Sequence, residues 1–164
     1  MSITFSAGEA LELAVKNERN AAKFYRRAAR LFPDAPRWDF LVKLAEMEDQ
    51  HEKIFVALAA ELSAAEQEPT AYDPMDEAVL FLDAMAAGHG GEGSSKAATG
   101  LTGRESMAEI LHKAIRLEGR TILFFIGLRD LVPAKLGRGK VVRVLNEEKQ
   151  HVVLLARQLR SLRA

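Results

Sequence analysis

The feature that most constrains this sequence is a pattern of acidic residues and histidines that occurs twice. The first copy is Glu18 followed by the segment Glu48-Asp49-Gln50-His51, and the second is Glu118 followed by Glu148-Lys149-Gln150-His151. The two copies are 100 residues apart. Together they supply four carboxylates and two imidazoles at helical spacing, which is a complete set of ligands for a two-metal site inside a four-helix bundle.

The pattern is part of a longer internal repeat. When residues 1–64 are aligned with residues 101–164 without a gap, 14 positions are identical, whereas about four are expected from ordinary residue usage. Two amphipathic helices could share Leu and Ala by chance. Chance does not explain the paired Pro33 and Pro133 or the paired Glu-x-x-His motifs, so we infer an internal duplication.

The first half of the chain is predicted to form a helical hairpin. Ser6-Ala7-Gly8-Glu9 has the pattern of a capping box and can start a helix. Pro33 ends that helix, and Pro36 suits the first turn of the next one.

The second half is predicted to form an equivalent hairpin. Thr102 and Ser106 are each followed by Glu three residues later, so they are competing starts for its first helix. Pro133 ends that helix, and Gly137 and Gly139 loosen the turn before the last helix.

A long connection separates the halves. Asp73-Pro74 can cap a short helix that ends near Ala86, and the glycine-rich segment 88–95 is predicted to be a flexible loop. We therefore predict an all-α fold with a single domain over residues 1–164, a four-helix bundle of two duplicated hairpins. Hairpin 1 covers residues 1–64, a crossover connection covers 65–100, and hairpin 2 covers 101–164.

The six acidic and histidine residues fall on apolar stripes with three-four spacing, which should face the core. The stripe of the second helix is Leu41, Leu44, Glu48, His51, Phe55, Leu58 and Leu62. That of the last helix is Val141, Val144, Glu148, His151, Leu155 and Leu162, with Gln158 as an interruption. The other two helices contribute Leu11, Ala14, Glu18 and Tyr25, and Leu111, Ala114, Glu118 and Phe125.

Burial of these carboxylates demands compensation. An ionised carboxylate without a partner is very unfavourable away from water, and four of them repel one another. Two metal ions compensate them directly, since Glu and His three residues apart project from one helix face. Oxygen and imidazole ligands suit iron or manganese, and zinc is also compatible. A buried salt-bridge or protonated-carboxylate network is the weaker alternative, because no Lys or Arg lies on these stripes near the six residues.

Other polar residues are assigned simpler roles. Glu147 is followed three residues later by Gln150 instead of His, so it is not expected to be a ligand. His89 lies in the glycine-rich segment, and His112 is one step off the apolar stripe of its helix. Neither histidine is therefore expected to bind metal. Tyr25 is expected to be a core residue whose hydroxyl can hydrogen-bond a ligand carboxylate.

Composition excludes several classes of protein. The chain has no cysteine, which removes disulfides and every Cys-ligated zinc or iron–sulfur site. The formal net charge is zero, so nucleic acid is not an expected partner. No apolar run is long enough to span a bilayer, and residues 1–10 lack the basic and apolar regions of a signal peptide. We expect a cytoplasmic protein that does not contact membranes.

At these residues the sequence resembles the ferritin-like superfamily, and most closely its rubrerythrin-like di-iron carboxylate proteins. The resemblance covers nearly the whole chain apart from the central connection. It rests on Glu18 with Phe24-Tyr25, on residues 44–51, on residues 114–118 with Phe124-Phe125, and on residues 145–151.

The resemblance implies two iron ions bound by Glu18, Glu48, His51, Glu118, Glu148 and His151. It also implies that Glu48 and Glu148 bridge the two ions. Rubrerythrins carry a cysteine-ligated rubredoxin domain, so a chain without cysteine needs a separate electron donor protein. Thr121 stands where these proteins have a further Glu, which weakens the expectation of rubrerythrin-type peroxidase chemistry.

Three functions follow as expectations. The first is an oxidoreductase whose di-iron site reduces peroxide or dioxygen. The second is iron handling, by ferroxidation, storage or delivery, where storage requires an assembled shell. The third is a non-catalytic helical interaction module whose metal is structural or absent. A homodimer or larger homo-oligomer is plausible for any of them.

Overall fold

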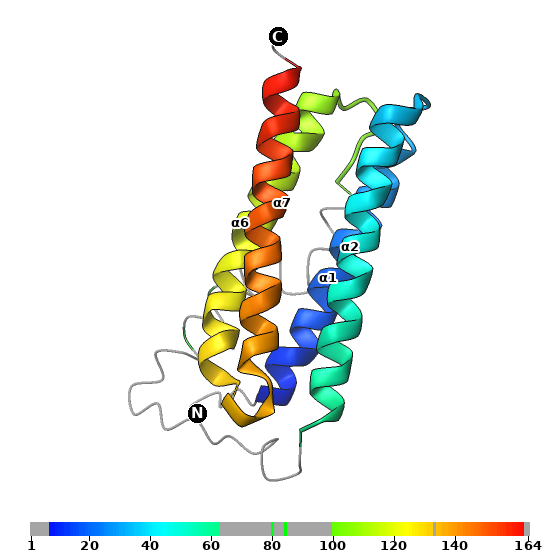
Figure 1. Cartoon of the computed structure of the whole chain (residues 1–164). Helices are drawn as coiled ribbons and strands as arrows, with labels where there is room; N and C mark the ends of the chain where they lie inside the picture. The colour runs from blue at the N-terminus through cyan, green and yellow to red at the C-terminus, as the bar shows by residue number, and fades with distance from the viewer. Residues whose placement is uncertain (1–6, 63–79, 81–83, 85–99, 133, 163–164) are drawn as a thin grey trace.

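The computed structural model describes residues 7–62, 80, 84, 100–132 and 134–162. Within these residues it contains four long helices, α1 (Ala7–Ala29), α2 (Ala35–Ala60), α6 (Met107–Leu131) and α7 (Arg138–Ser161). A short 3-10 helix, η1 (Ala134–Leu136), precedes α7. The four long helices lie side by side as an elongated bundle (Figure 1). No strand occurs in the described part of the chain, and the predicted all-α fold is confirmed.

Local capping sets where the helices begin. Asp34 caps α2 by accepting a hydrogen bond from the Arg37 backbone N–H, and Pro36 lies in the first turn. Ser106 caps α6 in a complete capping box. Its Oγ accepts from the Glu109 N–H at 3.3 Å, and the Glu109 carboxylate accepts from the Ser106 N–H at 2.8 Å. Of the two predicted starts for this helix, the structure therefore uses Ser106.

Gly137 caps α7 in a left-handed conformation, with φ of 106°. A Cβ atom at this position would lie 2.6 Å from Leu58 Cδ2 of α2, so any other residue would also displace the end of that side chain. The prediction for Gly139 was wrong. This residue lies inside the first turn of α7 and not in the preceding turn.

Two apolar clusters fill the bundle on either side of the six polar residues. The first core is Leu11, Ala14, Phe55, Leu58, Leu62, Phe124, Phe125, Leu128, Val132, Val141, Val144 and Leu145. The second core is Phe24, Tyr25, Ala28, Ala29, Phe32, Leu41, Leu44, Ala45, Leu101, Met107, Ile110, Leu111, Ala114 and Leu155. In each long helix the polar ligand candidates lie between a segment in one core and a segment in the other.

This arrangement fixes the direction of each helix. α1 and α7 begin at the first core, whereas α2 and α6 end there. The chain therefore leaves α2 at one end of the bundle and enters α6 at the opposite end, as a one-crossover topology requires. Leu162, predicted to continue the inward stripe of α7, is 45% exposed and lies just after the end of α7 at Ser161.

Some sequence predictions concern residues outside the described ones. They are the helix start at Ser6, the short helix from Asp73-Pro74, the glycine-rich segment with His89, and most of the crossover. The division of the chain into hairpins and crossover as one domain stays a prediction. Among the helices that are described, none combines the length and the apolar character needed to cross a membrane.

Candidate metal centre

All six residues singled out by the repeated motif lie in the interior of the bundle. Each long helix of hairpin 1 and hairpin 2 contributes to the group: Glu18 from α1, Glu48 and His51 from α2, Glu118 from α6, and Glu148 and His151 from α7. None of the six is more than 2% exposed. The structure thus brings together every residue that the sequence proposed as a ligand.

The six residues form two overlapping groups of potential ligands. The Glu18 cluster is Glu18, Glu48, His51 and Glu148, and the Glu118 cluster is Glu48, Glu118, Glu148 and His151. In each cluster one oxygen or nitrogen from every member lies within 4.8 Å of the others. Four ligand atoms at such distances can converge on a single ion.

Glu48 and Glu148 belong to both clusters, and each directs one carboxylate oxygen to each histidine. Glu148 places Oε1 at 2.7 Å from His51 Nδ1 and Oε2 at 3.0 Å from His151 Nδ1. Glu48 places Oε2 at 3.3 Å from His51 Nδ1 and Oε1 at 3.0 Å from His151 Nδ1. Two carboxylates that each face two positions in this way have the geometry of bridging ligands.

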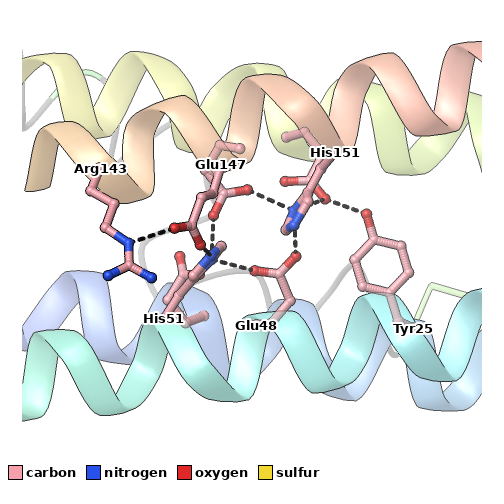
Figure 2. Close-up of polar contacts among 9 residues, drawn as sticks. Tyr25, Glu48, His51, Arg143, Glu147 and His151 are labelled. Carbon is pink, nitrogen blue, oxygen red and sulfur yellow. Dashed lines mark hydrogen bonds and ion pairs between the residues drawn. The ribbon is translucent and has the colours of Figure 1, made fainter.

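The two histidines are arranged as a pair. Their rings stack with centroids 5.3 Å apart and planes 18° apart. Both turn Nδ1 towards the carboxylates, as seen in Figure 2. In both clusters Nδ1 is therefore the nitrogen that would bind a metal.

The protein groups alone do not satisfy this centre. Five buried side-chain atoms make no hydrogen bond with any described residue: Glu48 Oε1, both carboxylate oxygens of Glu148, and both ring nitrogens of His151. Buried polar atoms without partners are costly, and such atoms concentrated at one place indicate a missing bonding partner. Carboxylate oxygens and imidazole nitrogens are the ligands that divalent iron and manganese accept, so the residues present fit a pair of such ions.

The raised pKa values of buried residues show that protonated forms are favoured in both clusters. Burial raises the pKa of Glu18, reinforced by the charge of Glu148, and burial also raises the pKa of Glu118, reinforced by Glu48. Burial lowers the pKa of His151, but the carboxylates of Glu148 and Glu48, each 3.0 Å from Nδ1, outweigh it and raise the pKa to about 9.

For His51 and Glu148, burial is likewise opposed by contacts with oppositely charged groups. Burial lowers the pKa of His51, but the carboxylates of Glu148, Glu18 and Glu48 close to its Nδ1 raise it well above its usual range. Burial raises the pKa of Glu148, and contacts with His151 and His51 overcome this and lower it to about 2. Without metal, the centre therefore holds protons where metal ions would otherwise supply the charge.

Sequence reasoning missed the role of Glu147. This half-buried residue of α7 places Oε2 at 3.0 Å from His51 Nε2, and its Oε1 accepts a hydrogen bond from Arg143 Nε at 2.8 Å (Figure 2). A carboxylate on the outer nitrogen of a metal-binding histidine fixes the tautomer and orientation of the ring. Only the packing of α7 against α2 reveals this contact, because Glu147 does not share the inward stripe of Glu148.

Tyr25 contacts the Glu118 cluster. Its hydroxyl donates a hydrogen bond to Glu118 Oε1, and Figure 2 shows Tyr25 pointing towards the centre. Tyr25 also lines a small cavity of about 10 Å³ together with Asn17, Ala21, Phe24, Leu117, Glu118 and Thr121. Such a volume holds about one water-sized molecule. The cavity thus reaches a ligand carboxylate from the side where Thr121 lies.

The residues assigned simpler roles lie apart from the centre. His112 is exposed on α6. Asp49 and Glu52 of α2 form ion pairs with Arg26 and Arg19 of α1 on the outside of the hairpin. Exposed pairs of this kind contribute about 0–1 kcal/mol each.

Comparisons with known proteins identify the fold. No family model matches the sequence, and a search of curated proteins finds no match. The structure is similar to a crystal structure described as that of a ferritin-like diiron-carboxylate protein from Thermotoga maritima. The TM-score is 0.72 at 20% sequence identity, over 96% of both chains. At this identity the likeness establishes architecture: the chain has the fold of a ferritin-like four-helix bundle.

Proposed function

We propose that this protein binds two iron ions in the centre of the bundle and is a redox protein that reacts with peroxide or dioxygen. One ion is bound by the Glu18 cluster and the other by the Glu118 cluster, with Glu48 and Glu148 as bridging ligands. Manganese and zinc are alternative occupants of the same ligands. The Thermotoga maritima protein, described as a diiron-carboxylate protein, supports iron.

The observation that carries this proposal is the position of the two shared carboxylates. Glu48 and Glu148 each direct one oxygen to each histidine, at distances between 2.7 and 3.3 Å. A buried salt bridge would need only one such contact for each carboxylate. Four contacts arranged about two nitrogen atoms place both carboxylates where they could hold two adjacent ions.

The residues of the chain have distinct tasks in such a reaction. Iron, when bound, supplies the electrons that an oxidant accepts. Glu18 and Glu118 each belong to one cluster only, so each would help to hold a single ion. Tyr25 holds Glu118 through its hydroxyl, and the two apolar cores exclude water on both sides.

The size of the cavity beside Glu118 favours a small oxidant. The cavity beside Glu118 measures about 10 Å³, which suits dioxygen, peroxide or water and not an organic substrate. Thr121 lines this cavity, where rubrerythrin-like proteins would have a further carboxylate. With no cysteine in the chain, reduction of the iron depends on a separate electron donor protein.

Anaerobic titration with Fe(II) tests the proposal directly. We expect two irons per chain by elemental analysis. On addition of peroxide or dioxygen, we expect near-ultraviolet absorption from oxidised iron. Failure of the loaded protein to react with either oxidant would refute the redox role. A large hollow assembly by light scattering would instead favour iron storage.

Substitution of individual ligands tests the assignment. We expect His51→Ala or Glu148→Ala to abolish binding of two irons per chain, because each removes a ligand from a cluster of four and Glu148 belongs to both. Glu12→Ala, at an exposed position of α1, is the matched control and should bind two. A His51→Ala protein that retains both irons contradicts the ligand set.

A further inference from the structure

The internal duplication predicts two equivalent metal positions, but the structure makes them different. A residue of hairpin 1 and the residue 100 positions later occupy corresponding places, as Glu18 and Glu118 or His51 and His151 do. Each of the six candidate ligands has an identical residue 100 positions away. Among the residues that contact the ligands, two differ from their counterparts, one beside each cluster.

The first difference lies behind the histidines. His51 Nε2 contacts Glu147 Oε2 at 3.0 Å, and Arg143 holds Glu147 through its other oxygen. The residue of hairpin 1 that corresponds to Glu147 is Met47, which offers no carboxylate. Accordingly, His151 Nε2 is buried and makes no hydrogen bond with any described residue.

The second difference lies beside the outer carboxylates. Glu118 Oε1 accepts a hydrogen bond from the Tyr25 hydroxyl. The same oxygen is the one that lies 3.8 Å from His151 Nδ1, so the tyrosine engages the oxygen that faces the metal position. The residue that corresponds to Tyr25 is Phe125, which has no hydroxyl to offer Glu18.

Both differences favour metal binding in the Glu18 cluster over the Glu118 cluster. A carboxylate acceptor on Nε2 orients His51 and increases the electron density at Nδ1, which strengthens the bond to a metal. A hydrogen bond donated to Glu118 withdraws electron density from that carboxylate and occupies one of its lone pairs. The first effect favours metal in the Glu18 cluster, and the second disfavours metal in the Glu118 cluster.

We infer that the two metal positions are inequivalent, and that iron binds first and more tightly in the Glu18 cluster because of Glu147 and Tyr25. This inference rests on the proposed di-iron site and adds an order of filling to it. The Glu118 cluster, which also borders the small cavity, is then the position that releases and rebinds iron more readily. Glu147 and Tyr25 act through the ligands and are positioning residues.

Partial loading provides the decisive test. A two-step isotherm alone is insufficient, because two cations that share Glu48 and Glu148 repel each other even at equivalent positions. Crystals of the full chain prepared anaerobically with one equivalent of Fe(II) should show the stronger iron anomalous peak at the Glu18 cluster. Equal peaks, or a stronger peak at the Glu118 cluster, overturn the inference.

Variants then assign the cause. Glu147→Met, which copies the residue found at position 47, should weaken the first step of Fe(II) binding by about 10–100-fold in calorimetry. It should also move the anomalous peaks towards equality. Tyr25→Phe should tighten the second step and leave the first unchanged. Glu12→Met, on the exposed face of α1, is the matched control and should change neither step.

The outcomes separate this inference from the proposed function. Equal weakening of both steps by Glu147→Met contradicts the inference while two irons still bind. A wild-type protein that binds no iron refutes both. Circular dichroism of the metal-free variants checks folding, and Glu147→Gln, which keeps an acceptor oxygen, should bind iron with an affinity between those of wild type and Glu147→Met.

Discussion

Charge within the centre is balanced by protons on a few residues when metal is absent. His51 and His151 are cationic partners of the cluster carboxylates, and Arg143, the other cation labelled in Figure 2, is paired with Glu147. Each histidine turns Nδ1 to the carboxylates, so a metal would replace the proton on that nitrogen. Metal ions and protons therefore compete for the same atoms.

This competition predicts how the metal-free protein responds to pH. The pKa of His151 is raised from 6.5 to about 9, and that of His51 is raised further. Between these values the unfolded chain loses protons that the folded protein keeps. The free energy of unfolding should therefore fall as pH rises from 6.5 to 9, by up to about 1.4 kcal/mol per pH unit for each histidine. Urea denaturation in the presence of a chelator measures this slope.

Other groups in the centre do not reverse the sign in this range. The raised pKa values of Glu18 and Glu118 act in the same direction above 4.5, and the lowered pKa of Glu148 acts only below it. His151→Gln should reduce the slope, whereas His112→Gln, at an exposed position of α6, should not. Stability of the metal-free protein that rises over this range would contradict the charge assignment.

The six inner residues of the centre could be predicted from a single sequence, because their helical spacing places them on apolar stripes that should be buried. An acidic residue on an apolar stripe is conspicuous, and its repetition after 100 residues makes it more so. Glu147 left no such signal, since a Glu on a half-exposed helix face is ordinary. Its importance depends on the distance between α7 and α2, which only the packed structure gives.

At the scale of the elements, the entry into α7 depends on one glycine. Gly137 combines a φ of 106° with a Cβ position that would be 2.6 Å from Leu58 Cδ2. We expect Gly137→Ala to reduce the free energy of unfolding by about 1–3 kcal/mol, because it adds backbone strain and displaces a core side chain. Chemical denaturation of the purified variant measures the change.

Gly139 provides the control for this experiment. It lies two residues further along, inside α7, and a Cβ atom there would have no neighbour within 4 Å. Gly139→Ala should be neutral or stabilising by up to about 1 kcal/mol, since alanine restricts the unfolded chain and favours helix. If both variants lost the same stability, the contact with Leu58 would not be the cause.

Helix boundaries were partly predictable for local reasons. Ser106 and Thr102 have the same spacing to a following Glu, and in both cases that Glu accepts a hydrogen bond from the earlier backbone N–H. Thr102 Oγ1, however, accepts from the Arg104 N–H, and Gly103 has φ of 86°, so this segment forms a turn and no helix begins at Thr102. All members of the stripe predicted for α2 are buried, Leu62 included, although α2 ends at Ala60. In the stripe of α7, Leu162 is exposed. Periodicity predicts which face of a helix is apolar but not where the helix stops.

At the scale of the whole molecule, the six polar residues form a layer that separates the two apolar cores. We expect iron binding to raise the melting temperature, because it stabilises the folded state alone. At free Fe(II) near 100 times the dissociation constant, the gain is about 2.7 kcal/mol, or roughly 5–10 °C for a domain of this size. Anaerobic thermal melts with and without Fe(II) measure the shift.

Glu148→Ala isolates the contribution of the metal to this stability. The variant removes a carboxylate common to both clusters, so its melting temperature should not respond to Fe(II). Glu12→Ala should respond like the wild-type protein. An equal shift in all three proteins would show that iron stabilises the bundle at some other place.

The distribution of ligands between the hairpins has a consequence for ancestry. Each hairpin contributes three of the four members of one cluster and borrows the fourth, Glu48 or Glu148, from the other. A lone ancestral hairpin could complete its ligand set only by pairing with an identical twin, and any mutation would then have altered both ends of the site at once. A single chain that carries both hairpins is free of that constraint, so Glu147 and Tyr25 can differ from the corresponding Met47 and Phe125.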